Sequence, residues 1–358
     1  MAIYDISHKL KRIIKLSKHI TTRDITGLTE ERIDEINNIS IPNNWVTRKL
    51  LQKPAKNIDS KTFIIPVTDG VITGYFFEKR DSKALSGLSP LIIFYHGGGW
   101  TWGNMDLYNF FCARLADLTQ ASVLSVDYRL APRYKFPTAV EDCYDTLLWA
   151  ANGARYWKTD PDRIFLIGDS AGGNLAAVVS RLSRDRKGPS IAGQILIYPV
   201  TDGRMRTDSY AQYKDCPTLT DKDMTFFIQN YQREPKDILN PNFSPLLSKD
   251  HSRLPPALII AAEYDPLHDD AMLYADALAS ADTPVKYLEV KKTVHGFINY
   301  PAATGAAETE CAIQQFVGGR SVEQVTLTTQ KQLEKQNKRE LKLAHKVNKN
   351  LISAEVEE

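Results

Sequence analysis

Cysteine is scarce in this sequence, and the cysteine positions argue against two classes of site. The 358 residues contain four cysteines with no Cys-x-x-Cys pair, namely Cys112, Cys143, Cys216 and Cys311. Disulfide frameworks and zinc sites place cysteines at short, recurring spacings. We therefore expect reduced thiols, and neither a disulfide-built fold nor a zinc site.

The sequence also lacks an excess of charge and any long apolar run. Its formal net charge is +2, so the composition gives no reason to expect a nucleic-acid partner. No stretch approaches the roughly 18 consecutive apolar residues of a membrane span. The N-terminus shows no apolar run before a small-residue cleavage site, which argues against a signal peptide. These features predict a cytoplasmic globular protein.

Short apolar segments alternate with helix-like segments through most of the chain. Segments 63–67 and 71–77 flank Asp69-Gly70 and predict a β-hairpin. Six more strands are expected at 91–95, 122–126, 164–167, 195–198, 257–261 and 285–290, with helices at 106–118, 139–150, 171–182, 268–279 and 306–316. Nearly all-apolar strands that alternate with amphipathic helices indicate a mostly parallel sheet covered on both faces. The prediction is an α/β fold with about eight strands.

We assign this α/β core to residues 56–202 and 251–317. Residues 203–250 interrupt the alternation, and with the helical segment 1–55 they are predicted to form a cap over the carboxyl edge of the sheet. The first helix is basic and amphipathic, so it could contact a membrane, but we favour packing of its apolar face on the protein itself. Residues 318–358 form a charged tail, expected to be helical or disordered, with a homodimer through a short helix as the minority alternative.

The sequence Gly168-Asp169-Ser170-Ala171-Gly172 is the strongest chemical signal in the chain. It follows an apolar strand and leads into a helix-like segment, which is the context in which a Gly-x-Ser-x-Gly motif exposes a nucleophilic serine on a sharp turn. The helix N-terminus behind Ser170 offers unpaired N–H groups and a positive dipole end. The alternative is a glycine-rich turn whose serine has no catalytic role.

A serine hydroxyl needs a base within reach and an acid to orient that base. Of the seven histidines, His295 lies in a loop directly after the last expected strand, where sites on open α/β sheets assemble. The acid is expected after a strand that lies between the serine and the histidine in the sequence. Asp265 meets this condition best. Three neighbouring carboxylates are the alternatives: Glu263, Asp269 and Asp270.

The glycine run His96-Gly97-Gly98-Gly99-Trp100 follows the strand at 91–95. Consecutive glycines let backbone N–H groups approach a substrate oxygen without side-chain interference. We expect Gly98 and Gly99, together with Ala171 after the serine, to form an oxyanion hole. A phosphate-binding loop is the alternative, but the Gly-Lys-Ser/Thr and Gly-x-Gly-x-x-Gly signatures are lacking. No metal or cofactor is expected.

Taken together, these motifs resemble the hormone-sensitive-lipase-like branch of the α/β-hydrolases. The resemblance covers roughly residues 60–316 and rests on five stretches in the expected order: His96–Trp100, Asp127–Pro132, Gly168–Asn174, Asp265–Leu267 and His295–Phe297. It implies an eight-stranded sheet, a helical cap and serine-dependent ester hydrolysis, as in bacterial acetyl esterases and arylacetamide deacetylases. Arg133 departs from the family pattern, which usually has Glu at this position.

The resulting prediction is a carboxylesterase that hydrolyses short-chain acyl esters, acetyl to butyryl, through an acyl-enzyme. Ser170 is the expected nucleophile, His295 the base and Asp265 the orienting acid. The alternatives are an amidase or deacetylase with the same residues and, less favoured, a non-catalytic small-molecule-binding protein on the same scaffold. Eight aromatic residues are expected near the pocket or in its cap: Trp100, Trp102, Tyr108, Phe136, Tyr210, Tyr213, Phe226 and Phe227.

Overall fold

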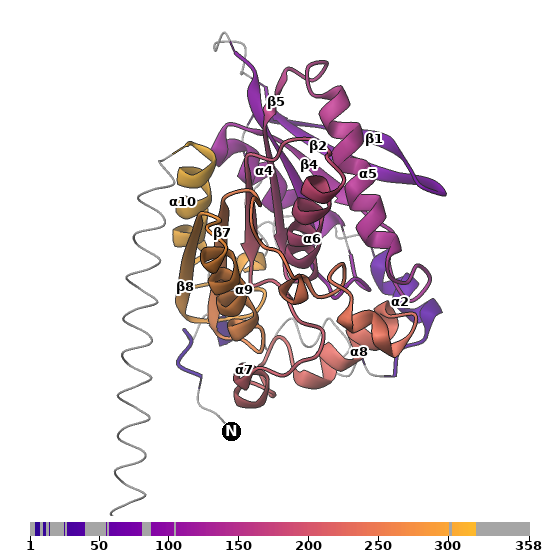
Figure 1. Ribbon diagram of the computed structural model, residues 1–358, viewed down its shortest axis with the longest axis vertical. Helices are drawn as coiled ribbons and strands as arrows, with labels where there is room; N and C mark the ends of the chain where they lie inside the picture. The colour runs from indigo at the N-terminus through magenta and orange to yellow at the C-terminus, as the bar shows by residue number, and fades with distance from the viewer. Residues whose placement is uncertain are drawn as a thin grey trace, which may run out of the picture.

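The computed structural model describes residues 4–7, 10, 11, 14, 25, 27–39, 55, 57–80, 87–103, 105–300 and 303–319. Its centre is an eight-stranded sheet of order β1-β2-β4-β3-β5-β6-β7-β8 (Figure 1). The strands are β1 (Ile58–Val67), β2 (Gly70–Lys79), β3 (Ser89–Tyr95), β4 (Ser122–Asp127), β5 (Thr159–Asp169), β6 (Gly193–Ile197), β7 (Ala257–Tyr264) and β8 (Val285–Val294). The hairpin strands β1 and β2 pair antiparallel, and β2 also pairs antiparallel with β4. From β4 to β8 every pairing is parallel.

The alternation of side chains along β3 divides the interior into two cores. Leu91, Ile93 and Tyr95 are buried in one core, whereas Ile92 and Phe94 are buried in the other. Successive residues of a strand point to opposite faces, so a strand that is apolar throughout must be covered on both sides. The almost continuous apolar pattern in the sequence is therefore explained by a sheet buried between two helical layers.

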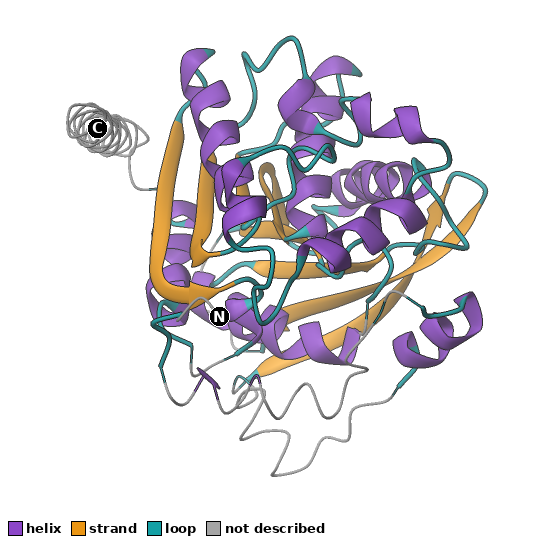
Figure 2. Ribbon diagram, turned by 90° about the horizontal axis from the view of Figure 1, so that it is seen from below, coloured by secondary structure: helices purple, strands orange, loops and turns teal. Residues whose placement is uncertain are grey.

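Helices cover both faces of the sheet (Figure 2). The first core contains residues of α5 (Thr138–Gly153), α6 (Ala171–Asp185) and α9 (His268–Ser280), and the second contains residues of α4 (Met105–Thr119) and α10 (Ala306–Val317). The helix α6 packs against β3, β5 and β6, near the middle of the sheet. Since α6 starts directly after β5, its N-terminus is held at the carboxyl edge of the parallel strands.

Additional helices lie beyond that edge. Between β6 and β7 the chain forms α7 (Asp208–Gln212), α8 (Asp221–Tyr231) and two short 3₁₀ helices at Pro235–Leu239 and Pro245–Leu247. A capping box starts α8: Thr220 Oγ1 accepts from the Asp223 N–H, and the Asp223 carboxylate accepts from the Thr220 N–H. With α2 (Glu30–Asn37), α7 and α8 lie at the same end of the molecule (Figure 1).

The described residues of the first segment pack onto the body of the protein. Ile6, Leu10 and Ile14 are buried in the second core, and Ile25 and Ile33 are buried in the first. These five apolar side chains are therefore buried against the rest of the protein. None of the described helices is long and apolar enough to cross a membrane.

The predicted fold class is confirmed, including the eight strands and their mostly parallel pairing. Most of the expected helices and strands are extended by a few residues at their ends. The predicted tail lies, from residue 320 onward, outside the described residues, as does most of the segment 1–55.

One buried ion pair joins the carboxyl end of β4 to α5, and it generates a stability prediction. Arg129 donates from Nη2 to Asp142 Oδ1 at 2.6 Å and from its backbone N–H to Asp142 Oδ2 at 3.0 Å, and the Asp142 side chain is 0% exposed. Removing one partner of a buried pair leaves an uncompensated charge, at a cost of about 3–5 kcal/mol.

We therefore expect Arg129→Ala to lower the free energy of unfolding by about 3 kcal/mol or more, measured by urea denaturation. The control is Arg186→Ala, because Arg186 pairs with Glu141 at the surface. An exposed pair is worth about 0–1 kcal/mol. Equal losses in the two variants would contradict this account of the β4 end.

Candidate active site

Ser170 sits on a strained turn between β5 and α6. Its backbone has φ 56° and ψ −118°, a conformation that residues other than glycine rarely adopt. Backbone hydrogen bonds hold the turn: the Ser170 N–H donates to Ile197 O at 2.9 Å, and Ser170 O accepts from the N–H groups of Asn174 at 3.0 Å and Val200 at 3.3 Å. Strain of this kind costs about 1–3 kcal/mol and persists where the surroundings determine the conformation.

The glycines on either side of Ser170 make this turn sterically feasible. A Cβ atom on Gly168 would lie 2.1 Å from Gly172 O, and a Cβ atom on Gly172 would lie 2.0 Å from Tyr95 O. Both distances are far below van der Waals contact and involve rigid backbone atoms. Only glycine therefore lets β5, α6 and the end of β3 approach closely enough to present Ser170 at the sheet edge.

A hydrogen-bond relay connects Ser170 to two residues that are far away in the sequence. His295 Nε2 lies 2.9 Å from Ser170 Oγ, and His295 Nδ1 lies 2.7 Å from Asp265 Oδ2. The other Asp265 oxygen, Oδ1, accepts from the Leu267 N–H at 2.9 Å. Asp265 is fully buried and His295 is buried at 7% exposure. The structure thus brings together the three side chains that the sequence singled out, each from a loop after a parallel strand.

The alternative acids have other partners. Glu263 Oε2 accepts from the Lys292 N–H at 2.6 Å. Asp269 Oδ2 accepts from the Ser209 N–H at 2.9 Å, and Asp270 Oδ2 accepts from the N–H groups of Thr201 and Asp202. None of the three contacts the imidazole of His295 within the part of the chain that the structure describes. Asp269 and Asp270 lie in the first turn of α9, as expected from the sequence.

The glycine loop after β3 and the start of α6 carry backbone N–H groups that have no protein acceptor among the described residues. Gly98 has φ +113° and Gly99 has φ +61°, and a Cβ atom on Gly98 would lie 2.0 Å from Trp102 O. Among the described residues, no protein acceptor binds the N–H groups of Gly98, Gly99 or Ala171. Ala171 is the first residue of α6, where N–H groups are unpaired by geometry and the helix dipole is positive. These three amides are available to a developing negative charge.

Sequence reasoning did not assign a role to Asp169, which anchors this loop. Asp169 Oδ1 accepts from the Gly97 N–H at 2.8 Å, and Tyr108 Oη donates to Asp169 Oδ2 at 3.4 Å. Burial raises the pKa of Asp169 to about 6. The carboxylate thus joins the residue before the nucleophile to the first residue of the glycine loop. The signal was present in the sequence, because an aspartate directly after a buried apolar strand needs a polar partner.

His96 supports the loop from the other side. Its ring stacks on Tyr128 with centroids 4.2 Å apart, and its Nδ1 lies 2.7 Å from Gly97 O. Burial lowers the pKa of His96 to about 4, so the ring is neutral at neutral pH and Nδ1–H donates to Gly97 O. A Cβ atom on Gly103 would lie 2.2 Å from His96 Cε1. His96 is therefore packed as part of the loop and does not reach Ser170.

The segment between β6 and β7 contacts both the glycine loop and the helix α6 that follows Ser170. Phe227 of α8 lies against Gly99 so closely that a Cβ atom on Gly99 would be 2.1 Å from the ring, and Phe227 also packs edge-on against Trp102. Asn174 of α6 donates from Nδ2 to Phe243 O at 2.8 Å. Phe227 and Trp102 thus form an aromatic wall beside the glycine loop. Trp100, Phe136 and Tyr210 are buried and serve packing.

Arg133, where the sequence departs from the pattern it resembles, has a structural partner. It forms ion pairs with Glu30 at 3.0 Å and Asp34 at 2.6 Å, both in α2. Arg133 thus connects the segment after β4 to α2 through two exposed ion pairs. None of the described His, Cys, Asp and Glu residues form a group of three that could hold a metal ion.

A model of the α/β-hydrolase fold matches residues 92–299, more than half of the chain and the whole stretch from β3 to the loop of His295. This chain belongs to that family. The carboxylic ester hydrolase LipN of Mycobacterium tuberculosis is 39% identical over 252 residues, which cover 69% of this chain and 66% of LipN. Ethyl acetate hydrolase of Pseudomonas putida is 36% identical over 220 residues, covering 61% and 69% of the two chains. The match thus spans just under two thirds of LipN.

Among solved structures, a hyperthermophilic esterase from the archaeon Pyrobaculum calidifontis superimposes with a TM-score of 0.78 at 33% identity. The superposition covers 87% of this chain and 98% of that esterase. The structural likeness therefore extends beyond the family match at residues 92–299, and it includes nearly all of the archaeal protein.

A charged cluster next to Asp265 generates a pH prediction. His268 Nδ1 lies 2.9 Å from Asp269 Oδ1, and His268 Nε2 lies 3.5 Å from Glu289 Oε1, which also pairs with Lys291. Burial alone would lower the pKa of His268, but the hydrogen bonds to Asp269 and Glu289 raise it to about 9. The pKa of His268 is therefore higher in the folded than in the unfolded state. The stabilisation of the fold by the His268 charge is fully present below the unfolded-state pKa and is lost as the pH rises through about 9.

We expect His268→Gln to lower the free energy of unfolding at pH 6–7, and the difference from wild type to shrink as the pH rises through about 9. The difference in the free energy of unfolding is measured by urea denaturation at pH 6, 7, 8, 9 and 10, with added points at roughly half-unit steps where the difference changes. His251→Gln is the control, because burial lowers the pKa of His251. A His268→Gln deficit that stays constant from pH 6 to 10 would show that the charge of His268 contributes nothing.

Proposed function

We propose that this protein is a serine carboxylesterase that hydrolyses short-chain acyl esters through an acyl-enzyme intermediate. The observation that carries the proposal is the continuous relay from Asp265 through His295 to Ser170, with distances of 2.7 and 2.9 Å. The membership in the α/β-hydrolase family and the esterases among the relatives support the same reaction class. The order of the three residues along the chain is also that of α/β-hydrolases.

In the first half of the reaction, Ser170 Oγ attacks the ester carbonyl carbon while its proton passes to His295 Nε2. The charge on the imidazolium is stabilised by the Asp265 carboxylate, which also fixes the tautomer by accepting from Nδ1–H. The carbonyl oxygen becomes an oxyanion and accepts hydrogen bonds from the amides of Gly98, Gly99 and Ala171. Fixed donors of this kind are worth about 10²- to 10³-fold in rate each.

The tetrahedral intermediate collapses when His295 gives its proton to the alkoxide oxygen, and the alcohol leaves. A water molecule then attacks the acyl-enzyme with the same imidazole as its base, and the acid is released with Ser170 regenerated. The proton taken from Ser170 thus leaves with the alcohol, and the proton of the water returns to Ser170. All steps use one base, so no second titratable group is required.

Two observations support a preference for small acyl groups. A relative with 36% identity is named ethyl acetate hydrolase. In this chain, the Phe227 ring lies directly against Gly99, and Trp102 packs on the same ring. Bulky aromatic side chains beside the proposed oxyanion donors leave less room for an extended acyl chain.

Ser170→Ala is expected to lower kcat on p-nitrophenyl butyrate by roughly a millionfold, because triad members act as a unit. The melting temperature is expected to stay close to that of the wild type or to rise. Ser180→Ala is the matched control, since Ser180 is a buried serine within α6, the helix that starts directly after Ser170. Retained turnover in Ser170→Ala, with loss in neither variant, would refute Ser170 as the nucleophile.

A series of p-nitrophenyl esters from acetate to decanoate, with the matched anilides, tests the substrate class. We expect kcat/KM to be highest for acetate or butyrate and to fall at longer chains, and the anilides to react far more slowly because an amine leaves less readily than a phenol. A maximum at octanoate or beyond would contradict the short-chain preference. Anilide rates equal to the ester rates would favour the amidase alternative.

A further inference from the structure

The last residue of α2, Asn37, forms two hydrogen bonds with the loop that follows the glycine run. Asn37 Nδ2 donates to Thr101 O at 3.0 Å, and Asn37 Oδ1 accepts from the Gly103 N–H at 3.2 Å. One amide side chain therefore satisfies two backbone groups that lie two residues apart. Asn37 is 64 residues away from Thr101 in the sequence, so this pair of hydrogen bonds is a tertiary contact and not a local turn.

The loop that contains Thr101 and Gly103 is joined by hydrogen bonds to Gly98 and Gly99. Gly98 O accepts from the N–H groups of Thr101 at 3.1 Å and Trp102 at 2.8 Å, and Thr101 Oγ1 donates to Gly99 O at 3.0 Å. On the far side, Gly103 packs against the His96 ring. A displacement of Thr101 or Gly103 would therefore carry Gly98 and Gly99 with it, and the direction of their free N–H groups would change.

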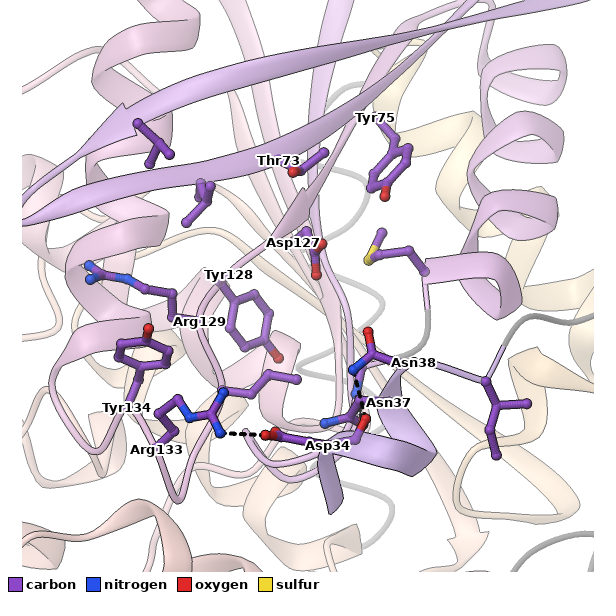
Figure 3. Close-up of a pocket in the computed structure, with 16 residues that line it drawn as sticks. Asp34, Asn37, Asn38, Thr73, Tyr75, Asp127, Tyr128, Arg129, Arg133 and Tyr134 are labelled. Atoms are coloured by element: carbon purple, nitrogen blue, oxygen red, sulfur yellow. Dashed lines mark hydrogen bonds and ion pairs between the residues drawn. The ribbon is translucent and has the colours of Figure 1, made fainter. Parts of the chain in front are cut away.

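The other contacts of α2 that involve described residues lie mainly toward its start. A cavity of about 520 Å³ lies between the end of the helix, at Asp34 to Ile39, and the sheet residues of β2 and β4, including Thr73 and Asp127 (Figure 3). Asn37 itself lines this cavity. On the helix, Ile33 is buried, and Arg133 reaches Glu30 and Asp34 in ion pairs whose partners are all more than a third exposed. Exposed pairs contribute about 0–1 kcal/mol each. Within the part of the chain that the structure describes, the two hydrogen bonds of Asn37 are therefore the direct link between the end of α2 and this loop.

We propose that Asn37 is a positioning residue that fixes the oxyanion loop from the N-terminal helix. This inference rests on the proposed esterase function, since it assigns Asn37 a role in the same reaction. Asn37 does not touch the reacting atoms. It holds the Thr101 carbonyl and the Gly103 amide, so that the amides of Gly98 and Gly99 stay aimed at the position of the oxyanion. Because those amides act on the charge that develops in the transition state, Asn37 affects kcat more than KM.

The test compares Asn37→Ala and Asn37→Asp with Asn38→Ala. The aspartate keeps an acceptor for the Gly103 N–H but loses the donor and places a carboxylate oxygen against Thr101 O. Asn38 is the matched control because it is the adjacent amide, and among the described residues its Nδ2 donates to Asp34 O of α2 at 2.8 Å. Full-length proteins are assayed with p-nitrophenyl butyrate, and kcat is expressed per active site titrated with a fluorophosphonate, so that unfolded protein does not count.

We expect kcat per titrated site to fall about 10- to 100-fold in Asn37→Ala, less than the loss of a complete oxyanion donor, and at least as much in Asn37→Asp. KM is expected to stay within about twofold, and Asn38→Ala to match the wild type. A trifluoromethyl ketone, whose hemiketal oxygen occupies an oxyanion hole, is expected to lose affinity by the same factor as kcat/KM.

Three outcomes overturn the proposal while the wild type remains a Ser170-dependent esterase. The first is an unchanged kcat per site in both Asn37 variants, even if the melting temperature falls. The second is a rise in KM alone, which would make α2 a substrate wall. The third is an equal loss in Asn38→Ala, which would reflect general damage to α2. If the wild type shows no turnover that Ser170→Ala abolishes, the proposed function itself fails, and the role of Asn37 fails with it.

Discussion

The tight approach of three backbone segments around Ser170 is the constraint on which the rest of the site depends. Gly168 and Gly172 let β5, α6 and the end of β3 come within distances that a single Cβ atom would prevent. The strained φ of Ser170 is maintained because the hydrogen bonds to Ile197 and Asn174 fix the chain before and after the turn. The serine hydroxyl is thereby held at the carboxyl edge of a parallel sheet, where loops from other strands can reach it.

Buried polar groups then connect this turn to its surroundings. Asp169 binds the Gly97 amide, and Asn174 binds the backbone carbonyls of Val200 and Phe243. Asp265 accepts a hydrogen bond from the Leu267 amide with one oxygen, and its other oxygen contacts His295. Each anchor satisfies a buried donor or acceptor that would otherwise cost about 1–3 kcal/mol. The same hydrogen bonds that satisfy these groups therefore also set the geometry of the proposed reaction.

The sequence allowed the fold and the three relay residues to be predicted because these features have local signals. Apolar runs mark the strands, and glycine spacing marks the turn at Ser170. The choice of Asp265 over Glu263 followed from its place after a strand, and the structure shows Glu263 bound to the Lys292 amide instead. The start of β5 at Thr159 was missed because Asp160, Asp162 and Arg163 are polar, although Thr159 pairs with Ser89 of β3. The contacts of Asn37 and Arg133 could not be predicted, because the α2 helix carries no signal of where it docks.

The central claim is that Ser170 becomes covalently acylated during turnover. The most direct measurement is peptide mapping by mass spectrometry after the protein is mixed with p-nitrophenyl acetate and quenched in acid within milliseconds. The account predicts one acetyl group per molecule, on the peptide that contains Ser170, and its rapid loss when the quench is delayed beyond substrate exhaustion. Turnover at a normal rate with the adduct on another residue, or with no adduct at any quench time and no label from a fluorophosphonate on Ser170, would contradict it.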